Sequence, residues 1–221
     1  MNLRIMPREL HDHFFREAKR EGYRSRAAYK LIEIDDRRHL LKRGDAVLDC
    51  GAAPGSWLQV AAERVGPNGR VVGVDLKPID PAGLPQQVRL IEGDFTTMEA
   101  SELLGGIDAF GVVLSDMAPS TTGDRTIDHH GSVRLCHAVI DRCGELLQPG
   151  GMIALKVLEG EAYPDLIERA RHFFGVVKGF KPKASRDQST EIYLIADDFS
   201  GESTRPPAAA APKPSPSGWG Q

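Results

Sequence analysis

The chain has 221 residues, a formal charge of −3, 41% hydrophobic residues and 27% charged residues. These proportions are ordinary for a globular protein, and the length favours one domain. No stretch approaches the roughly 18 uninterrupted apolar residues of a membrane span, and the three cysteines lack the paired spacing of a disulfide or zinc framework, so we expect no membrane partner and a reduced, cytoplasmic setting.

The N-terminal part of the chain is basic although the whole chain is mildly acidic. Residues 1–43 hold twelve lysines and arginines against seven acidic residues, and residues 178–190 hold four against one. Such local patches can bind a polyanion, but composition alone favours a solvated helix followed by a loop. We interpret residues 1–22 as a basic arm or helix, and this segment lacks the apolar core that a secretory signal contains.

From residue 45 onward, apolar runs alternate with amphipathic stretches. Near-continuous apolar strands separated by helices are typical of a parallel sheet that is covered on both faces. With right-handed crossovers this predicts a doubly wound α/β fold, with a mostly parallel seven-stranded sheet. The predicted strands are residues 46–50, 70–75, 88–94, 110–116, 152–157, 175–180 and 191–196, and the predicted helices are 56–65, 132–147 and 163–174.

The end of the domain departs from this alternation. Only about ten residues, rich in Lys, Ser and Pro, separate the last two predicted strands, which leaves no room for a crossover helix. The final strand is therefore predicted to be antiparallel. We predict that one domain spans residues 23–199 and that the Pro- and Ala-rich residues 200–221 form a disordered tail.

Ionisable residues stand where the predicted strands end. Ligands of such sheets bind outside the carboxyl ends of the strands, and an antiparallel final strand would begin at that same edge. One aspartate after a strand is usually a turn former or a helix cap, but a convergence of six ionisable residues predicts a functional site. They are Asp49, Asp75, Asp94, Asp116, Lys156 and Glu191.

A glycine-rich turn, CGAAPGSW, follows the first strand. Gly51 and Gly55 allow a sharp turn and a close approach to a ligand. The pattern is not G-x-G-x-x-G or a P-loop, and Pro54 removes one N–H from a phosphate cradle. Asp75, at the end of the next strand, is placed to bind ribose hydroxyls.

Together these segments resemble a known family. DCGAAPGSW resembles motif I of the RrmJ/FtsJ family of S-adenosylmethionine-dependent ribose 2′-O-methyltransferases. Further matching blocks occur in the family's order over about residues 14–198: YRSRAAYKLIEID, GVDLKPIDP, EGDF, LSDMAP, ALKVLEGE and SRDQSTEIYLIA. The resemblance implies a Rossmann-like methyltransferase fold and S-adenosylmethionine as the cofactor. It is strongest to the bacterial branch that modifies a uridine in the A loop of large-subunit (23S) ribosomal RNA.

The resemblance also implies which residues form the site. The catalytic tetrad of the family corresponds to Lys30, Asp116, Lys156 and Glu191. Its cofactor contacts correspond to Gly55, Trp57, Asp75, Asp94 and Asp116, with Asp75 on the ribose, Asp94 on the adenine amino group and Asp116 at the methionine end. Ser120 stands where an Asn is common, and residues 121–131 match poorly, which weakens the inference about the target nucleotide. Ribosomal RNA, within the large subunit, is the expected partner of a monomeric enzyme.

Ribose methylation requires that a base remove the hydroxyl proton and that oxygen, methyl carbon and sulfur be aligned. Lys156 interrupts an apolar strand, an unfavourable position without a function, and we assign it as the base. Lys30 lies on the rim of a helix, where snorkelling is equally compatible with its position, and we assign it, with Glu191, to orienting the base and the hydroxyl. Trp57 fits packing as well as ligand contact.

Three alternatives remain open. The first is a non-catalytic RNA-binding factor of ribosome assembly, the second a methyltransferase of another RNA such as tRNA, and the third a small-molecule O-methyltransferase, which would need a lid that the sequence does not contain. A metal site is not predicted. The acidic and histidine residues that could suggest one are close in sequence and are expected on a loop: Asp124, Asp128, His129 and His130.

Overall fold

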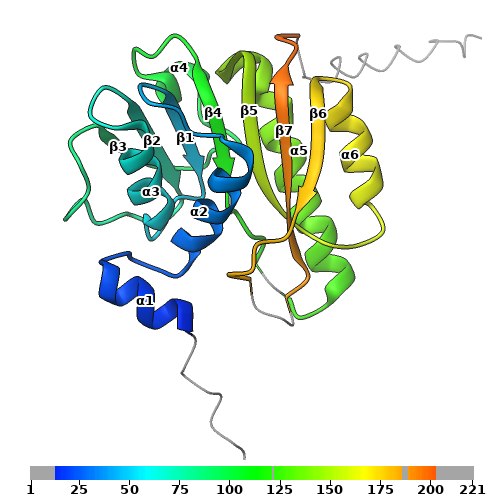
Figure 1. Cartoon of the computed structure of the whole chain (residues 1–221). Helices are drawn as coiled ribbons and strands as arrows, with labels where there is room; N and C mark the ends of the chain where they lie inside the picture. Colours follow the sequence, from blue (N-terminus) through cyan, green and yellow to red (C-terminus); the bar gives the residue numbers. More distant parts are fainter. Residues whose placement is uncertain (1–12, 121, 186–188, 203–221) are drawn as a thin grey trace, which may run out of the picture.

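The computed structural model describes residues 13–120, 122–185 and 189–202, which form a seven-stranded sheet with helices on both faces (Figure 1). The strands are β1 (Ala46–Cys50), β2 (Arg70–Asp75), β3 (Val88–Glu92), β4 (Phe110–Ser115), β5 (Leu147–Leu158), β6 (Phe174–Phe180) and β7 (Glu191–Phe199). The helices are α1 (His13–Glu21), α2 (Ala27–Arg38), α3 (Ser56–Val65), α4 (Ala100–Leu104), α5 (Arg125–Leu146) and α6 (Tyr163–Arg171).

The strand order is β3-β2-β1-β4-β5-β7-β6. The pairs β1–β2, β1–β4, β2–β3 and β4–β5 are parallel, whereas β7 is antiparallel to both β5 and β6. The predicted doubly wound sheet with an antiparallel final strand is thus confirmed. Strand order reverses between β1 and β4, and the crevice outside their carboxyl ends is where a ligand of such a sheet binds.

Alternate residues of the central strands face two separate cores, as the two-residue period of a strand requires. Val47 and Val71 pack with α2 and α3, whereas Leu48 and Val72 pack on the opposite face with α4 and α5. The sheet is therefore the middle of three layers (Figure 1). Asp49 and Lys156 each lie two residues after a member of the α2–α3 core, Val47 and Ala154, so alternation directs both side chains to that side of the sheet.

Helix α5 differs from its prediction. The sequence favoured a loop up to about residue 131, but the helix begins at Arg125. The Asp124 side chain caps it, accepting hydrogen bonds from the main-chain N–H groups of Thr126 (2.8 Å) and Ile127 (3.1 Å). Gly131 weakens the helical pattern in the sequence, because glycine is unfavourable inside a helix. The structure explains this glycine by close packing, since a Cβ at residue 131 would lie 2.8 Å from Pro119 Cβ.

The described part of the chain ends shortly after β7, at residue 202, so the predicted tail lies almost entirely outside the described residues, as do residues 1–12 of the predicted arm. Residues 13–21 of that arm form α1. Over the described ranges, no helix has both the length and the apolar character to cross a membrane.

Candidate active site

Two buried ion pairs lie at the carboxyl edge of the sheet. Lys30 Nζ of α2 lies 2.7 Å from Glu191 Oε1, at the start of β7. Lys156 Nζ of β5 lies 3.1 Å from Asp116 Oδ1, just after β4, and it also donates to the Asp116 main-chain carbonyl. All four side chains are between 9% and 21% exposed. The structure thus brings the predicted tetrad together as two lysine–carboxylate pairs.

Tyr193 joins these pairs and was not singled out from the sequence. It lies directly opposite Lys156 in the β5–β7 ladder, and its hydroxyl donates to Asp116 Oδ1 at 2.6 Å. Burial, the negative charges of Asp116 and Glu191 and this hydrogen bond raise the pKa of Tyr193 well above its ordinary value. Tyr193 therefore stays a hydrogen-bond donor. Its spacing of two residues from Glu191, which puts both on one face of a strand, was the available signal.

The pKa of Glu191 depends on three neighbours. Burial raises it, but hydrogen bonds from Lys30 and Ser185 and the positive charges of Lys30 and Lys156 outweigh burial, so the pKa lies below its ordinary value. Ser185 Oγ lies 2.6 Å from Glu191 Oε1. Glu191 is consequently a carboxylate that is ready to hold the Lys30 ammonium.

The loop that carries Ser185 is fastened to α2. Glu33 accepts hydrogen bonds from the main-chain N–H groups of Lys183 (2.7 Å) and Ala184 (2.9 Å). Lys181 Nζ, from the same loop, donates to the Ser189 carbonyl at 3.0 Å. The β6–β7 loop is therefore held beside the tetrad by Glu33. The local sequence could not predict this contact, because Glu33 follows the pattern of an ordinary polar residue on a helix.

Two further carboxylates, Asp49 in β1 and Asp75 at the end of β2, lie at the same edge as the tetrad residue Asp116. Asp49 is fully buried, and neither carboxylate oxygen has a hydrogen-bond partner. Burial, followed by the negative charges of Asp116 and Asp75, raises its pKa well above the ordinary value. An edge with this excess of acidic groups has the chemistry to accept a cationic ligand that also brings hydrogen-bond donors.

The glycine-rich turn is tied to β2 through Asp75. Asp75 Oδ2 accepts from the Ala53 N–H at 2.9 Å, and Oδ1 accepts from the Lys77 N–H at 2.8 Å. Gly51 and Gly55 both have positive φ, 76° and 103°. A Cβ on Gly51 would lie 3.1 Å from Met117 Cα, so the loops after β1 and β4 approach each other closely at the switch point.

Two predicted cofactor residues lie apart from the tetrad contacts. The Trp57 side chain is 2% exposed, and its indole N–H donates to the Ala27 carbonyl at 2.8 Å. Any ligand contact from Trp57 would therefore come from its main chain. Asp94 is exposed after β3, where Oδ1 accepts from the Thr96 N–H and hydroxyl at 2.8 and 2.7 Å.

The acidic and histidine cluster has structural roles on α5. Asp128 accepts three hydrogen bonds from Thr122 and Gly123. His129 Nδ1 lies 2.7 Å from the Leu158 carbonyl, and its Nε2 accepts from the Ala162 N–H at 3.0 Å, which holds the loop after β5. Within the described ranges, no group of three His, Cys, Asp or Glu residues is arranged to hold a metal ion.

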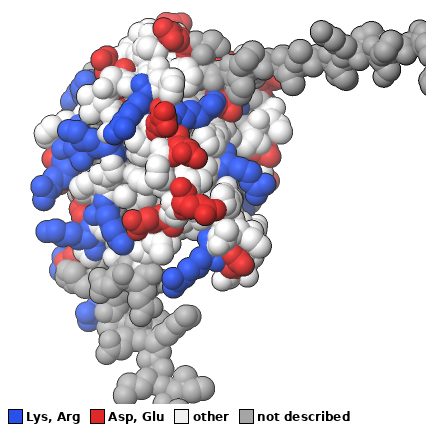
Figure 2. Space-filling view, turned by 90° about the vertical axis from the view of Figure 1, so that its right-hand side faces the viewer, with Lys and Arg blue, Asp and Glu red and all other residues white. Residues whose placement is uncertain are grey.

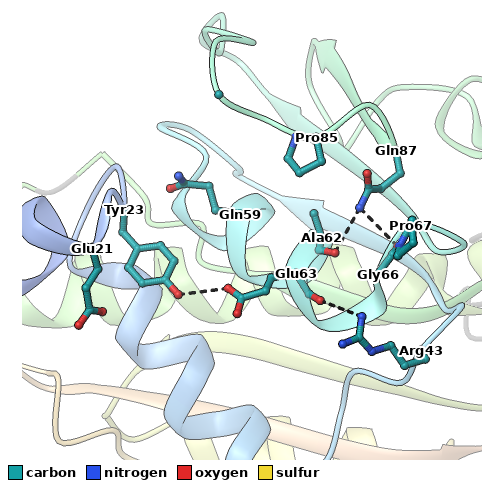
Figure 3. A pocket seen from close by; sticks show the side chains of 11 residues that line it. Glu21, Tyr23, Arg43, Gln59, Ala62, Glu63, Gly66, Pro67, Pro85 and Gln87 are labelled. Carbon is teal, nitrogen blue, oxygen red and sulfur yellow. Dashed lines mark hydrogen bonds between the residues drawn. The ribbon is translucent and has the colours of Figure 1, made fainter.

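A surface pocket of about 490 Å³ lies between α3 and the loop between β2 and β3 (Figure 3). Its lining residues include Tyr23, Gln59, Glu63 and Gln87, and none of the predicted site residues lines it.

On the molecular face near β6 and α6, basic and acidic side chains are interspersed (Figure 2). This face therefore does not present a field of one sign to a nucleic acid.

Comparison with known proteins gives consistent matches. A model of the family described as FtsJ-like methyltransferase matches residues 23–199. The chain is 45% identical over 198 residues to Ribosomal RNA large subunit methyltransferase E of Azoarcus sp., covering 88% of this chain and 95% of the relative. It is 47% identical over 185 residues to the protein of that name in Syntrophobacter fumaroxidans, covering 83% and 93%.

Solved structures share the fold. A Plasmodium falciparum protein assigned as a ribosomal RNA methyltransferase matches with a TM-score of 0.71 and 32% identity, over 81% of this chain and 100% of that one. Aeropyrum pernix fibrillarin, solved with bound S-adenosyl-L-methionine, matches with a TM-score of 0.55 and 17% identity, over 77% of this chain and 73% of that one. At that identity the likeness concerns the fold alone.

Proposed function

Because the chain belongs to the FtsJ-like methyltransferase family, we propose that this RNA methyltransferase transfers a methyl group from S-adenosylmethionine to a ribose 2′-hydroxyl of large-subunit ribosomal RNA. The observation that carries the proposal is the pair of lysine–carboxylate contacts at the carboxyl edge, beside the switch point between β1 and β4. The names of the relatives support ribosomal RNA as the substrate class.

The acidic edge suits this donor. When bound, S-adenosylmethionine supplies an electrophilic methyl group on a positively charged sulfur. The unpartnered carboxyl group of Asp49, together with Asp75 and Asp116, gives that charge a favourable environment. Asp75 retains acceptor capacity for ribose hydroxyls beside its two main-chain contacts. Asp94 and the main chain around Gly55 are proposed to complete the donor site at its adenine and methionine ends.

Lys156 is the proposed general base. A neutral Lys156 amine takes the proton of the 2′-hydroxyl as the oxygen forms its bond to the methyl carbon and the carbon–sulfur bond breaks, leaving a neutral thioether. Asp116 holds Nζ from one side, and the Tyr193 hydroxyl fixes Asp116 in turn. Lys30, held by Glu191, is placed to hydrogen-bond the acceptor ribose.

The finer assignments follow the family resemblance. We propose a uridine in the A loop as the target, the assembled large subunit as the substrate and a monomer as the active form. The three cysteines are buried and free of disulfides, which supports a reduced, cytoplasmic setting. The domain proposed to act spans residues 23–199.

The test is methyl transfer from S-adenosylmethionine labelled in the methyl group. Large subunits lacking this modification, naked 23S RNA and tRNA are each incubated with the purified protein. The expected result is label in the large-subunit RNA, in dinucleotides that resist alkaline hydrolysis because the 2′-oxygen is blocked. Label only in tRNA would reassign the substrate. RNA binding without label on any RNA would favour a non-catalytic assembly factor.

A further inference from the structure

We propose that Arg24 is a positioning residue for the methyl donor. Its guanidinium ties the glycine-rich turn after β1 to the loop between β2 and β3, and so holds two walls of the donor site at a set separation. The inference rests on the proposed function, because it concerns the same donor site.

The contacts of Arg24 join segments that are distant in sequence. Nη1 donates to the Pro54 carbonyl at 2.8 Å, inside the glycine-rich turn. Nη2 donates to the carbonyls of Asp80 at 2.5 Å and Ala82 at 2.6 Å, both in the β2–β3 loop. Both terminal nitrogens are therefore engaged with main-chain oxygens, and hydrogen bonds from a charged donor are the stronger kind.

The glycine-rich turn is shaped around this side chain. Gly55 has a φ of 103°, a backbone conformation that residues other than glycine rarely adopt. A Cβ on Gly55 would lie 2.8 Å from Arg24 Nη1 and 3.4 Å from Ile79 Cγ2. The turn, the guanidinium and the β2–β3 loop are therefore in direct contact at one point. If the Arg24 guanidinium is removed, the carbonyl oxygens of Pro54, Asp80 and Ala82 lose the cation that they share.

Arg24 lies in the linker between α1 and α2, and this linker leads directly into α2, which carries Lys30. The Arg24 N–H donates to Gln59 Oε1 at 2.9 Å, and Ser25 Oγ lies 2.8 Å from Ser56 Oγ. The α1–α2 linker is thus docked on α3, immediately after the glycine-rich turn, and the Gln59 side chain also lines the pocket in Figure 3. Arg24 consequently connects the donor loops to the helix that positions the acceptor-side lysine.

This placement assigns Arg24 a role other than phosphate binding. Its basic sequence context suggests a contact with RNA, but the guanidinium is directed at main-chain carbonyls within the protein. A lysine at this position would keep the charge, but its single nitrogen could not span both loops. Replacing Arg24 by lysine therefore separates the effect of the positive charge from the effect of joining the two loops.

The experiment compares Arg24→Gln and Arg24→Lys with Arg20→Gln in the full chain. Arg20 is a matched control, because its side chain is 69% exposed on α1 and pairs with Glu17 and Glu21 of the same helix. Calorimetry gives the dissociation constant of S-adenosylmethionine without RNA, and thermal unfolding with and without donor gives the donor-induced shift in Tm. Single-turnover assays at saturating donor give the methylation rate.

We expect both Arg24 variants to bind the donor about tenfold more weakly, equivalent to about 1.4 kcal/mol, with a smaller donor-induced shift in Tm. The methylation rate at saturating donor should fall less than donor affinity does, and the salt dependence of RNA binding should stay close to wild type. Arg20→Gln should bind the donor as wild type does. A purely structural role would lower the Tm of the unliganded protein but leave donor affinity unchanged.

Several results would overturn the inference. Donor affinity within about twofold of wild type in both Arg24 variants would do so, as would full recovery by Arg24→Lys, which would assign the effect to charge. A loss of RNA salt dependence with intact donor affinity would assign Arg24 to phosphate contact. If Arg24→Gln does not fold, the lysine variant carries the comparison. Wild-type protein that binds no donor would instead contradict the proposed function.

Discussion

Lys156 lies in a strand whose neighbours Leu155 and Val157 are fully buried, yet its ammonium reaches the edge of the sheet. A charged group in such surroundings is tolerated only with a partner. Asp116 supplies one, and the Tyr193 hydroxyl donates a hydrogen bond to the same Asp116 oxygen, Oδ1. At the residue scale, the site is therefore a chain of contacts in which each polar group is oriented by the next.

The role of Lys156 can be tested by changing its charge and its basicity separately. Lys156→Ala and Lys156→Arg should both lower single-turnover methylation by about 10²–10⁴-fold, the range typical for loss of a general base. Arginine fails because its guanidinium stays protonated and cannot accept a proton. Donor and RNA affinity, measured separately, should change little. A near-wild-type rate for Lys156→Arg would show that the positive charge, not proton transfer, is required.

Glu191 gives a prediction about pH. Because its pKa is lowered in the folded protein, its contribution to stability is fully present above the ordinary glutamate value near 4.5 and is lost as the pH falls through the lowered value. Glu191→Gln leaves Lys30 buried without its partner, which should destabilise the protein by about 3–5 kcal/mol at pH 7. The free energy of unfolding, measured by denaturant titration, should show this difference.

Measuring the free energy of unfolding by denaturant titration at several pH values between 7 and 3 provides the control. Protonated Glu191 resembles glutamine, so the difference between wild type and Glu191→Gln should shrink as the pH falls below about 4.5. A difference that is constant with pH would contradict the ion pair as its source.

At the scale of elements, α5 positions the end of β5. His129 bonds to the Leu158 carbonyl, Ser132 Oγ accepts from the Leu158 N–H at 3.0 Å, and Cys136 Sγ lies 3.2 Å from the Lys156 carbonyl. These three side chains follow one another along one face of the helix. The part of α5 that sequence analysis assigned to a loop thus contributes, through His129, to holding the end of the strand that carries Lys156.

The beginning of α5 depends on its cap. Asp124→Ala should lower the free energy of unfolding by about 0.5–2 kcal/mol, because two main-chain N–H groups lose their acceptor. Asp165→Ala is the matched control, since Asp165 is an exposed acidic residue in the first turn of α6, where Ala162 is the N-cap. Urea unfolding should separate the two variants. Equal midpoints would show that Asp124 is not an effective cap.

At the scale of the whole molecule, the basic residues have unequal roles. The guanidinium of Arg24 is engaged by main-chain carbonyls of the glycine-rich turn and of the β2–β3 loop. Lys181 and Lys183 are exposed on the β6–β7 loop, beside Glu191 and the tetrad. They are therefore the charges of this region that a phosphate backbone entering the site would meet first.

This arrangement predicts a specific salt dependence. Replacing Lys181 and Lys183 by glutamine should weaken RNA binding and reduce the slope of log affinity against log salt by about 0.7–0.9 for each phosphate that is no longer neutralised. Replacing Arg43 and Arg171, which lie before β1 and β6 at the opposite edge of the sheet, removes the same charge as a control. Equal slopes for the two double variants would show that the loop lysines are only solvated.

The layered architecture could be predicted from the amino-acid pattern alone. Near-continuous apolar runs between amphipathic stretches predicted the strands, the short connection before the last strand predicted its antiparallel direction, and aspartates after strands predicted an edge rich in carboxylates. These features could be predicted because apolar runs and the turn preferences of glycine are local, acting over a few residues. The family resemblance predicted which four residues form the tetrad and what chemistry they perform.

Only the tertiary structure decided how those residues are partnered. Lys30 and Glu191 come from opposite ends of the chain and meet because β7 inserts between β5 and β6. The same insertion places Tyr193 opposite Lys156, and the docking of the α1–α2 linker on α3 turns Arg24 from a surface charge into a bridge between two loops. Such contacts depend on where the crossovers place distant segments, which local patterns of residues do not encode.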